Sequence, residues 1–215
     1  MTGPAAARTA REEVLARIRT ALGPDPVAEP VPRDYRTRGE HAPGSEALLE
    51  LLTDRLLDYK ASVRRVPAAD LPRAVAELLA ARGARRVAVP PALPADWVTG
   101  DARVVDGDPP LSVDDLDGLD GVVTASAVAV AATGTIVLDG SPDQGRRAVT
   151  LVPDLHVCVV RADQVVESVP EALGRLDATR PLTFISGPSA TSDIELNRVE
   201  GVHGPRTLDV LLVTD

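Results

Sequence analysis

The sequence has very little cysteine and very few aromatic side chains. Cys158 is the only cysteine, so the chain cannot form an internal disulfide and cannot supply the set of thiolates that holds an iron–sulfur cluster. It stands in the apolar run His156–Val160, where we expect a small buried strand residue rather than a reactive thiol. Aromatic residues make up only 2% of the chain, so valine, leucine, isoleucine and alanine must build the core. That composition suits a buried parallel sheet between alanine-rich helices.

Positive charge and long apolar runs are also lacking. The net charge of −9 opposes binding to nucleic acid, whose affinity for proteins comes mainly from clustered lysine and arginine. No run of about 18 apolar residues could span a bilayer, and Met1–Arg11 lacks the apolar segment of a signal peptide. We therefore expect a cytoplasmic protein with no nucleic-acid partner and no membrane span.

The apolar pattern predicts one α/β domain behind an N-terminal extension. Residues 1–44 are expected to hold an amphipathic helix at Arg8–Leu22 and a proline-rich linker, and residues 45–215 to form the domain. Within the domain, short apolar runs alternate with helical patterns, which favours a central, mostly parallel sheet flanked by helices. Two apolar runs around Thr133–Thr135 predict a short antiparallel hairpin.

Capping residues and periodicity place the individual elements of the domain. Asp70 and Gly83 bound one predicted helix, and Ser112 with Asp115 opens another. The expected helices are Leu48–Leu56, Leu71–Arg82, Ser112–Leu119 and Gln164–Leu176, the last capped by Asp163. The expected strands are Ala61–Val66, Arg86–Val89, Val104–Val105, the hairpin Val128–Leu138, Ala148–Val152, His156–Val160, Leu182–Ser186 and Leu208–Val213.

The densest polar cluster follows the apolar strand that begins at Leu182. Ligands of open α/β sheets bind beyond the carboxyl ends of strands, where small-residue loops expose backbone N–H groups. Hydroxyl groups there could bind an anion, and carboxylates could lie beside a substrate, a metal or a helix dipole. An ordinary capped helix start would explain the same residues. They are Ser186, Gly187, Ser189, Thr191, Asp193 and Glu195.

A histidine lies close by, in the glycine-rich segment Glu200–Arg206. His203 could reach a ligand from such a loop and act as acid, base or donor at neutral pH. It could equally bond to nearby backbone and make the turn rigid. Because Ser186–Glu195 and Gly201–Arg206 are close in sequence, we expect Glu195 and His203 to share one crevice and to carry any catalytic step.

The turn Thr133-Gly134-Thr135 is a third candidate, expected to face the same crevice and to bind a ligand. Its hydroxyls and open backbone are similar to an anion cradle, although glycine between two strands is more often a plain turn. Gln144, Arg146 and Arg147 follow, and an arginine there could pair with a carboxylate or phosphate. Asp154 and His156 complete the set of polar loop residues. His41, His156 and His203 lack the spacing of a zinc site, so no metal is expected, and no cofactor can be named.

Taken in order and spacing, four segments resemble the LUD domain, in its short form, the lactate-utilisation protein C type. The resemblance covers most of the chain, including the N-terminal helix. Where the family often has arginine within Ser-Gly-Pro-Ser-x-Thr, this chain has Ala190, so an anion contact from that position would need a substitute such as Arg146, Arg147 or Arg206. The four segments are Ala132–Leu138, Leu151–His156, Ser186–Ser189 with Asp193–Glu195, and Gly201–Pro205.

The resemblance implies a fold like that of the sugar-phosphate isomerase and CoA-transferase superfamily. It also implies an accessory role beside two iron–sulfur proteins in the oxidation of L-lactate to pyruvate. The polar loops add the expectation of a crevice that binds a small anionic ligand or helps to assemble the complex. Two alternatives stay open from the sequence. One is a stand-alone enzyme for a phosphorylated or CoA-linked metabolite with Glu195 as base or nucleophile, and the other is a noncatalytic binding or regulatory module.

Overall fold

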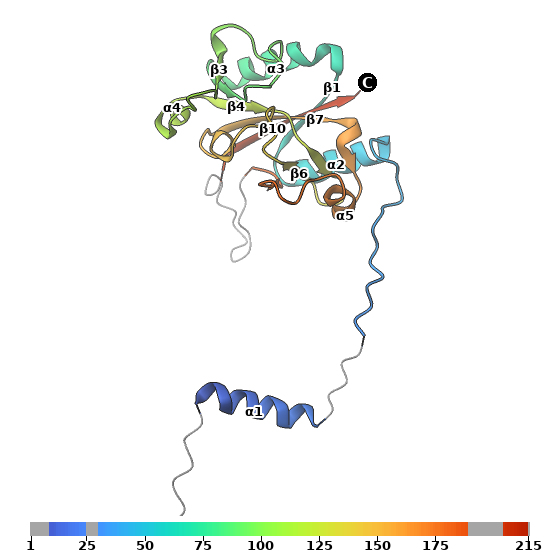
Figure 1. Ribbon diagram of the computed structural model, residues 1–215. Coiled ribbons are helices and arrows are strands. Elements are labelled where there is room, and N and C mark those ends of the chain that lie inside the picture. The colour runs from blue at the N-terminus through green and yellow to red at the C-terminus, as the bar shows by residue number, and fades with distance from the viewer. Residues whose placement is uncertain (1–8, 25–29, 189–203, 215) are drawn as a thin grey trace, which may run out of the picture. The chain divides into compact units, whose positions relative to one another are not determined.

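The computed structural model describes residues 9–24, 30–188 and 204–214, and the chain divides into two compact units between Tyr35 and Arg36 (Figure 1). The first unit holds α1 (Ala10–Leu22), which confirms the predicted N-terminal helix. A capping box starts it, because the Glu12 carboxylate accepts from the Thr9 N–H at 2.8 Å while the Thr9 hydroxyl accepts from Glu12 N–H. No side chain of α1 is buried.

The second unit is built on a central sheet of six strands, all parallel, in the order β1-β10-β7-β4-β2-β3. This arrangement confirms the predicted α/β class. Because such a sheet is covered on both faces, its inner strands are buried and largely apolar, whereas the edge strand β1 carries the exposed Arg64 and Arg65. The strands are β1 (Ser62–Pro67), β2 (Val87–Val89), β3 (Arg103–Val105), β4 (Gly121–Thr124), β7 (Leu155–Arg161) and β10 (Thr207–Thr214).

Alternate side chains of the central strands enter two different cores. In β7, Val157 and Val159 pack with α3 (Leu71–Arg82), whereas Cys158 and Val160 pack with α2 (Glu46–Asp58). Figure 1 shows α3 on one side of the sheet and α2, β6 and α5 on the other. The buried thiol of Cys158 matches its expected place in a strand.

A separate mixed sheet, in the order β8-β5-β6-β9, shares one core with α2 and the parallel sheet. Its strands β5 and β6 form the predicted antiparallel hairpin, β9 pairs antiparallel with β6, and β8 pairs parallel with β5. Ile136 of β6 packs with the leucines of α2, while Val137 packs with Ala172 of the short helix α5. The elements are β5 (Val128–Val130), β6 (Thr135–Leu138), β8 (Val165–Val166), β9 (Thr183–Ile185) and α5 (Val169–Leu173).

Two predicted elements are wrong. The segment expected as a strand at Ala148–Val152 is a 3-10 turn at Arg147–Thr150, whose Val149 packs against α4 (Val113–Asp117). The helix expected at Gln164–Leu176 is instead β8 followed by α5.

Burial of two adjacent valines explains why residues 165–166 form a strand and not a helix. Val165 and Val166 are both fully buried but in two different cores, because successive side chains of a strand point to opposite faces. Asp163 therefore caps no helix. Ser168 begins α5 instead, with Glu171 accepting from both its N–H and its hydroxyl at 2.8 Å.

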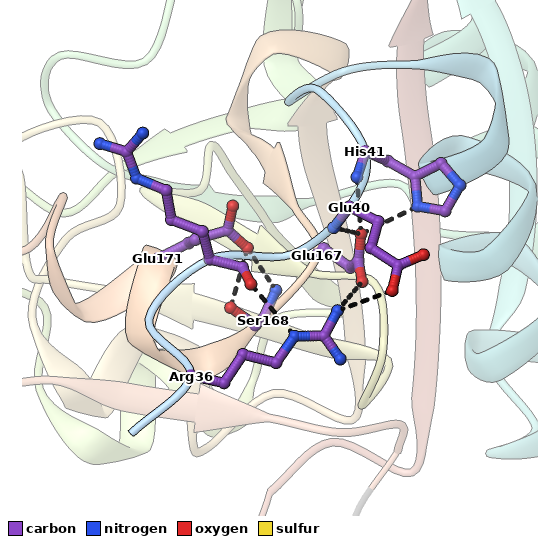
Figure 2. Close-up of polar contacts among 7 residues, drawn as sticks. Arg36, Glu40, His41, Glu167, Ser168 and Glu171 are labelled. Atoms are coloured by element: carbon purple, nitrogen blue, oxygen red, sulfur yellow. Dashed lines mark hydrogen bonds and ion pairs between the residues drawn. The ribbon is translucent and has the colours of Figure 1, made fainter. Parts of the chain in front are cut away.

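Residues 36–44 dock on the connection between β8 and α5, and we call them the strap. Figure 2 shows the strap residues Glu40 and His41 around Glu167. The Glu167 carboxylate accepts from the backbone N–H of Glu40 at 2.7 Å and of His41 at 2.9 Å, and the His41 ring Nδ1 lies 2.9 Å away. These hydrogen bonds, the His41 backbone first, lower the pKa of Glu167 to about 2. At Gly39 a Cβ atom would come within 2.4 Å of Glu167, so only glycine fits.

Among the residues that the structure describes, no helix combines the length and apolar character needed to cross a membrane.

Candidate functional site

Three hydroxyl groups from two predicted motifs meet at one end of the mixed sheet. Thr135 Oγ1 lies 2.8 Å from Thr133 Oγ1 and 2.8 Å from Ser186 Oγ. The pairing of Ile136 with Ile185 in adjacent antiparallel strands places Thr135 opposite Ser186. The structure therefore brings together the Thr133–Thr135 turn and the start of the Ser186 segment. We call these three residues the hydroxyl cluster.

The expected position of Ser186 within the fold is wrong. It follows β9, which belongs to the mixed sheet, and so it does not extend from the carboxyl edge of the parallel sheet. The strand Leu182–Ser186 was predicted correctly, but a three-residue strand carries no local signal that says which sheet it joins.

Both glycines of the predicted site pack against the last turn of α2. Gly134 has φ +58°, and a Cβ there would lie 2.7 Å from Arg55 Cβ. Gly187 has φ +78°, and a Cβ there would lie 2.6 Å from both the Cβ and the backbone oxygen of Tyr59. Left-handed backbone and close approach both require glycine at these positions. The glycines thus hold the hydroxyl cluster against α2.

A cavity of about 460 Å³ opens beside the hydroxyl cluster and is lined by polar groups. Arg55 contributes a guanidinium that is partly exposed and lies 3.6 Å from the Asp58 carboxylate and 3.8 Å from that of Asp54. These pairs are weak, because both partners are well solvated. The carboxyl end of α2 adds negative potential, so the cavity suits a ligand that both donates and accepts hydrogen bonds. Its lining is Arg55, Asp58, Tyr59, Ala132 and Thr133.

Arg55 is a candidate that the sequence reasoning missed. It looks like an ordinary surface arginine near the end of an amphipathic helix, and only the packing of Gly134 on α2 brings it to the cavity. Five predicted residues lie outside the described residues, so their shared crevice stays a prediction. They are Ser189, Thr191, Asp193, Glu195 and His203.

His156 was expected to begin the strand His156–Val160 and also to belong to the polar loop residues; the strand is confirmed and the place in the loop is wrong. It lies within β7 and is 1% exposed, with Nε2 2.8 Å from the Thr124 hydroxyl. Burial lowers its pKa to about 4, so the imidazole is neutral at pH 7 and serves the core. Asp154 does lie in the loop before β7, 3.4 Å from the Arg206 guanidinium.

Arg146 and Arg147 line a different cavity from Thr133. The Arg146 guanidinium donates twice to the buried Asp106 carboxylate, from Nε and Nη2, each at 2.9 Å. The side-chain oxygen of Gln144 is occupied as well, since it accepts from Asp139 N–H at 2.7 Å. Within the described ranges no three His, Cys, Asp or Glu side chains are grouped as a metal site would need.

A parallel sheet with helices on both faces and cavities bounded by its connecting loops defines an open α/β domain. Comparison with known proteins narrows the class. Residues 114–213 match the model of the LUD domain. Lactate utilization protein C of Deinococcus radiodurans is 49% identical over 197 residues, which is 90% of this chain and 86% of the relative. A protein of the same name from Bacillus subtilis is 35% identical over 101 residues, or 43% of this chain and 42% of its own length.

A solved structure agrees with these relatives. The crystal structure of a DUF162 family protein from Deinococcus radiodurans is 47% identical and superposes with a TM-score of 0.68, over 78% of this chain and 97% of that one. The chain belongs to the LUD-domain family, in its lactate utilization protein C branch.

Proposed function

We propose that this chain is an accessory subunit of an iron–sulfur-dependent complex that oxidises L-lactate. The observation that carries the proposal is the 49% identity with lactate utilization protein C over 90% of the chain, because the names of such relatives support a role in lactate utilisation. Electrons that leave lactate need an acceptor, and one buried cysteine supplies none. Cysteine-rich partner proteins therefore provide the electron path in this proposal.

Within that complex we assign the cavity beside the hydroxyl cluster to a small hydroxy acid. Arg55 and Thr133 offer donors for a carboxylate, and Asp58 offers an acceptor for a hydroxyl group. The proposal retains Glu195 and His203 as the residues of any proton transfer on this chain. Ser186, Ser189, Thr191 and Asp193 remain the proposed ligand contacts beside Thr133–Thr135.

The test is lactate-dependent dye reduction by purified components. We expect no turnover by this chain alone, turnover when the cysteine-rich partners are added, and collapse of that turnover when this chain is left out. Turnover by the chain alone at the rate of the complex would contradict the accessory role. Full activity of the partners in the absence of this chain would contradict the proposal that the chain takes part in lactate oxidation.

Matched variants test the site within the assembled complex. Arg55→Gln is expected to raise the KM for lactate, by about tenfold for one lost charged hydrogen bond. Arg85→Gln removes the same charge from an exposed position and should leave KM unchanged. Glu195→Ala and His203→Ala should lower the rate without changing the melting temperature. Glu50→Ala on α2 should change neither the rate nor the melting temperature. A large loss of stability in the Glu195 or His203 variant would show a structural role instead.

A further inference from the structure

A second and larger cavity lies at the carboxyl ends of β2 and β3. We call it the edge cavity. Pro91 comes just after β2, and Asp106–Asp108 directly follows β3. The opposite wall is the segment that follows β6, which is fixed over the strand ends by Ala92 N–H donating to Pro142 C=O at 3.0 Å. Parallel α/β sheets bind their ligands at this edge.

The walls of the edge cavity are mostly apolar and rigid. Four prolines and two leucines line it, and proline has neither a flexible side chain nor an N–H donor. The volume of about 610 Å³ lies within the usual range for sites that bind small organic molecules. Lactate offers such walls one methyl group, so a ligand with a larger apolar body matches them better. The residues are Pro91, Pro110, Pro142, Pro181, Leu138 and Leu182.

Some charged side chains on the lining of the edge cavity are paired with each other, and others are not. Asp106 and Arg146 neutralise each other through two hydrogen bonds of 2.9 Å, and Asp106 also accepts from Leu111 N–H. Arg147, the next residue in the chain, is exposed and has no ion pair within the described part of the chain. Asp108 likewise lines the cavity without an ion pair among the described residues. The Arg147 guanidinium is thus available to pair with an anionic ligand. The Asp108 carboxylate would repel a ligand that carries a second negative charge.

We propose that the edge cavity binds an organic anion whose carboxylate or phosphate pairs with Arg147 and whose apolar, ring-containing body fills the proline- and leucine-lined space. A guanidinium recognises either head group through paired N–H donors. The proposal is independent of the role in lactate oxidation, because it concerns a different cavity and a different ligand.

The test uses probes that share one ring system and differ in the head group. Binding of 1-naphthoate, 1-naphthyl phosphate and neutral 1-naphthol to the full chain is followed by naphthyl fluorescence, with inorganic phosphate as a control without a ring. We expect one site that binds at least one of the two anions about tenfold more tightly than naphthol. The preferred anion identifies the head group, and inorganic phosphate alone should not compete at the same concentration.

Three variants separate pairing with Arg147 from general charge. Arg147→Gln should weaken the anions about tenfold and leave naphthol unchanged, whereas Asp108→Asn should strengthen them. Arg85→Gln changes the net charge as Arg147→Gln does but lies just before β2, at its amino end, and should have no effect. Equal binding of all three ring probes, equal effects of the two arginine variants, or displacement of the probes by lactate would each overturn the proposal.

Discussion

Replacing Gly187 by alanine tests whether the hydroxyl cluster is held against α2 by close packing. Gly187 has φ +78°, and the added Cβ would lie 2.6 Å from the backbone oxygen of Tyr59. Backbone atoms of a helix end cannot turn aside as a flexible side chain would. The alanine must therefore push the β9 end away from α2, and Ser186 would move with it.

A second glycine allows the loss of stability in Gly187→Ala to be divided into a backbone part and a packing part. Gly83, at the end of α3, has φ +68° and no atom within 4 Å of a Cβ, so Gly83→Ala reports only the left-handed backbone, about 1–2 kcal/mol. Gly187→Ala carries the same backbone cost and adds an overpacking term of about 1–3 kcal/mol. The difference between the two variants isolates the contact with Tyr59.

Urea unfolding of the two variants measures this difference, and thermal unfolding checks it at about 2–4 °C per kcal/mol for a chain of this size. Gly187→Ala should also lower activity in the reconstituted complex, while Gly83→Ala should only lower stability. If Gly187→Ala is no less stable than Gly83→Ala, the close approach of β9 to α2 does not hold the cluster in place.

Two groups with lowered pKa values, His156 and Glu167, should make the stability of the protein depend on pH. The folded state keeps His156 neutral down to a pKa of about 4, whereas the unfolded chain takes up the proton near 6.5, so stability should fall by roughly 3 kcal/mol as pH drops from 6.5 to 4. His156→Gln should lack this part of the slope in urea unfolding, and equal slopes in both proteins would refute a buried neutral imidazole. The Glu167 carboxylate has a pKa lowered from 4.5 to about 2, so the docked strap should be most stable above pH 4.5 and lose stability as pH falls toward 2. Glu167→Gln should speed amide exchange at Glu40 and His41 at neutral pH, and exchange no faster than in Glu50→Gln would show that Glu167 does not hold the strap.

Local signals in the sequence were enough to predict helices whose ends are marked by capping residues. Leu71–Arg82 was predicted with both of its bounds. Gly83 ends the helix in the left-handed conformation, whereas Asp70 stands at the N-cap position without the predicted side-chain hydrogen bond. The capping box of Ser112 and Asp115 located the start of α4, whose end at Asp117 comes two residues before the predicted Leu119. The segment Gln164–Leu176 failed because its valines have a spacing that fits a helix or a buried strand, and only the surrounding cores decide between them.

The candidate site depends on contacts between distant parts of the chain, which a single sequence does not encode locally. Thr135 and Ser186 are 51 residues apart, and their hydrogen bond requires the register of β6 and β9. Arg55 reaches the same place only because two glycines let α2 approach. The sequence therefore predicted the polar turn residues, but neither the arginine beside them nor the apolar edge cavity.

Because Cys158 is buried, the folded protein should not react with thiol reagents. Burial raises the pKa of this thiol to about 12, and the thiolate is the form that reacts with alkylating and oxidising reagents. A cysteine introduced on the surface would consequently be the one site that such a reagent labels in the folded chain. Spectroscopic probes could then be attached at a chosen position, next to either cavity or on the strap, without first removing the native sulfur.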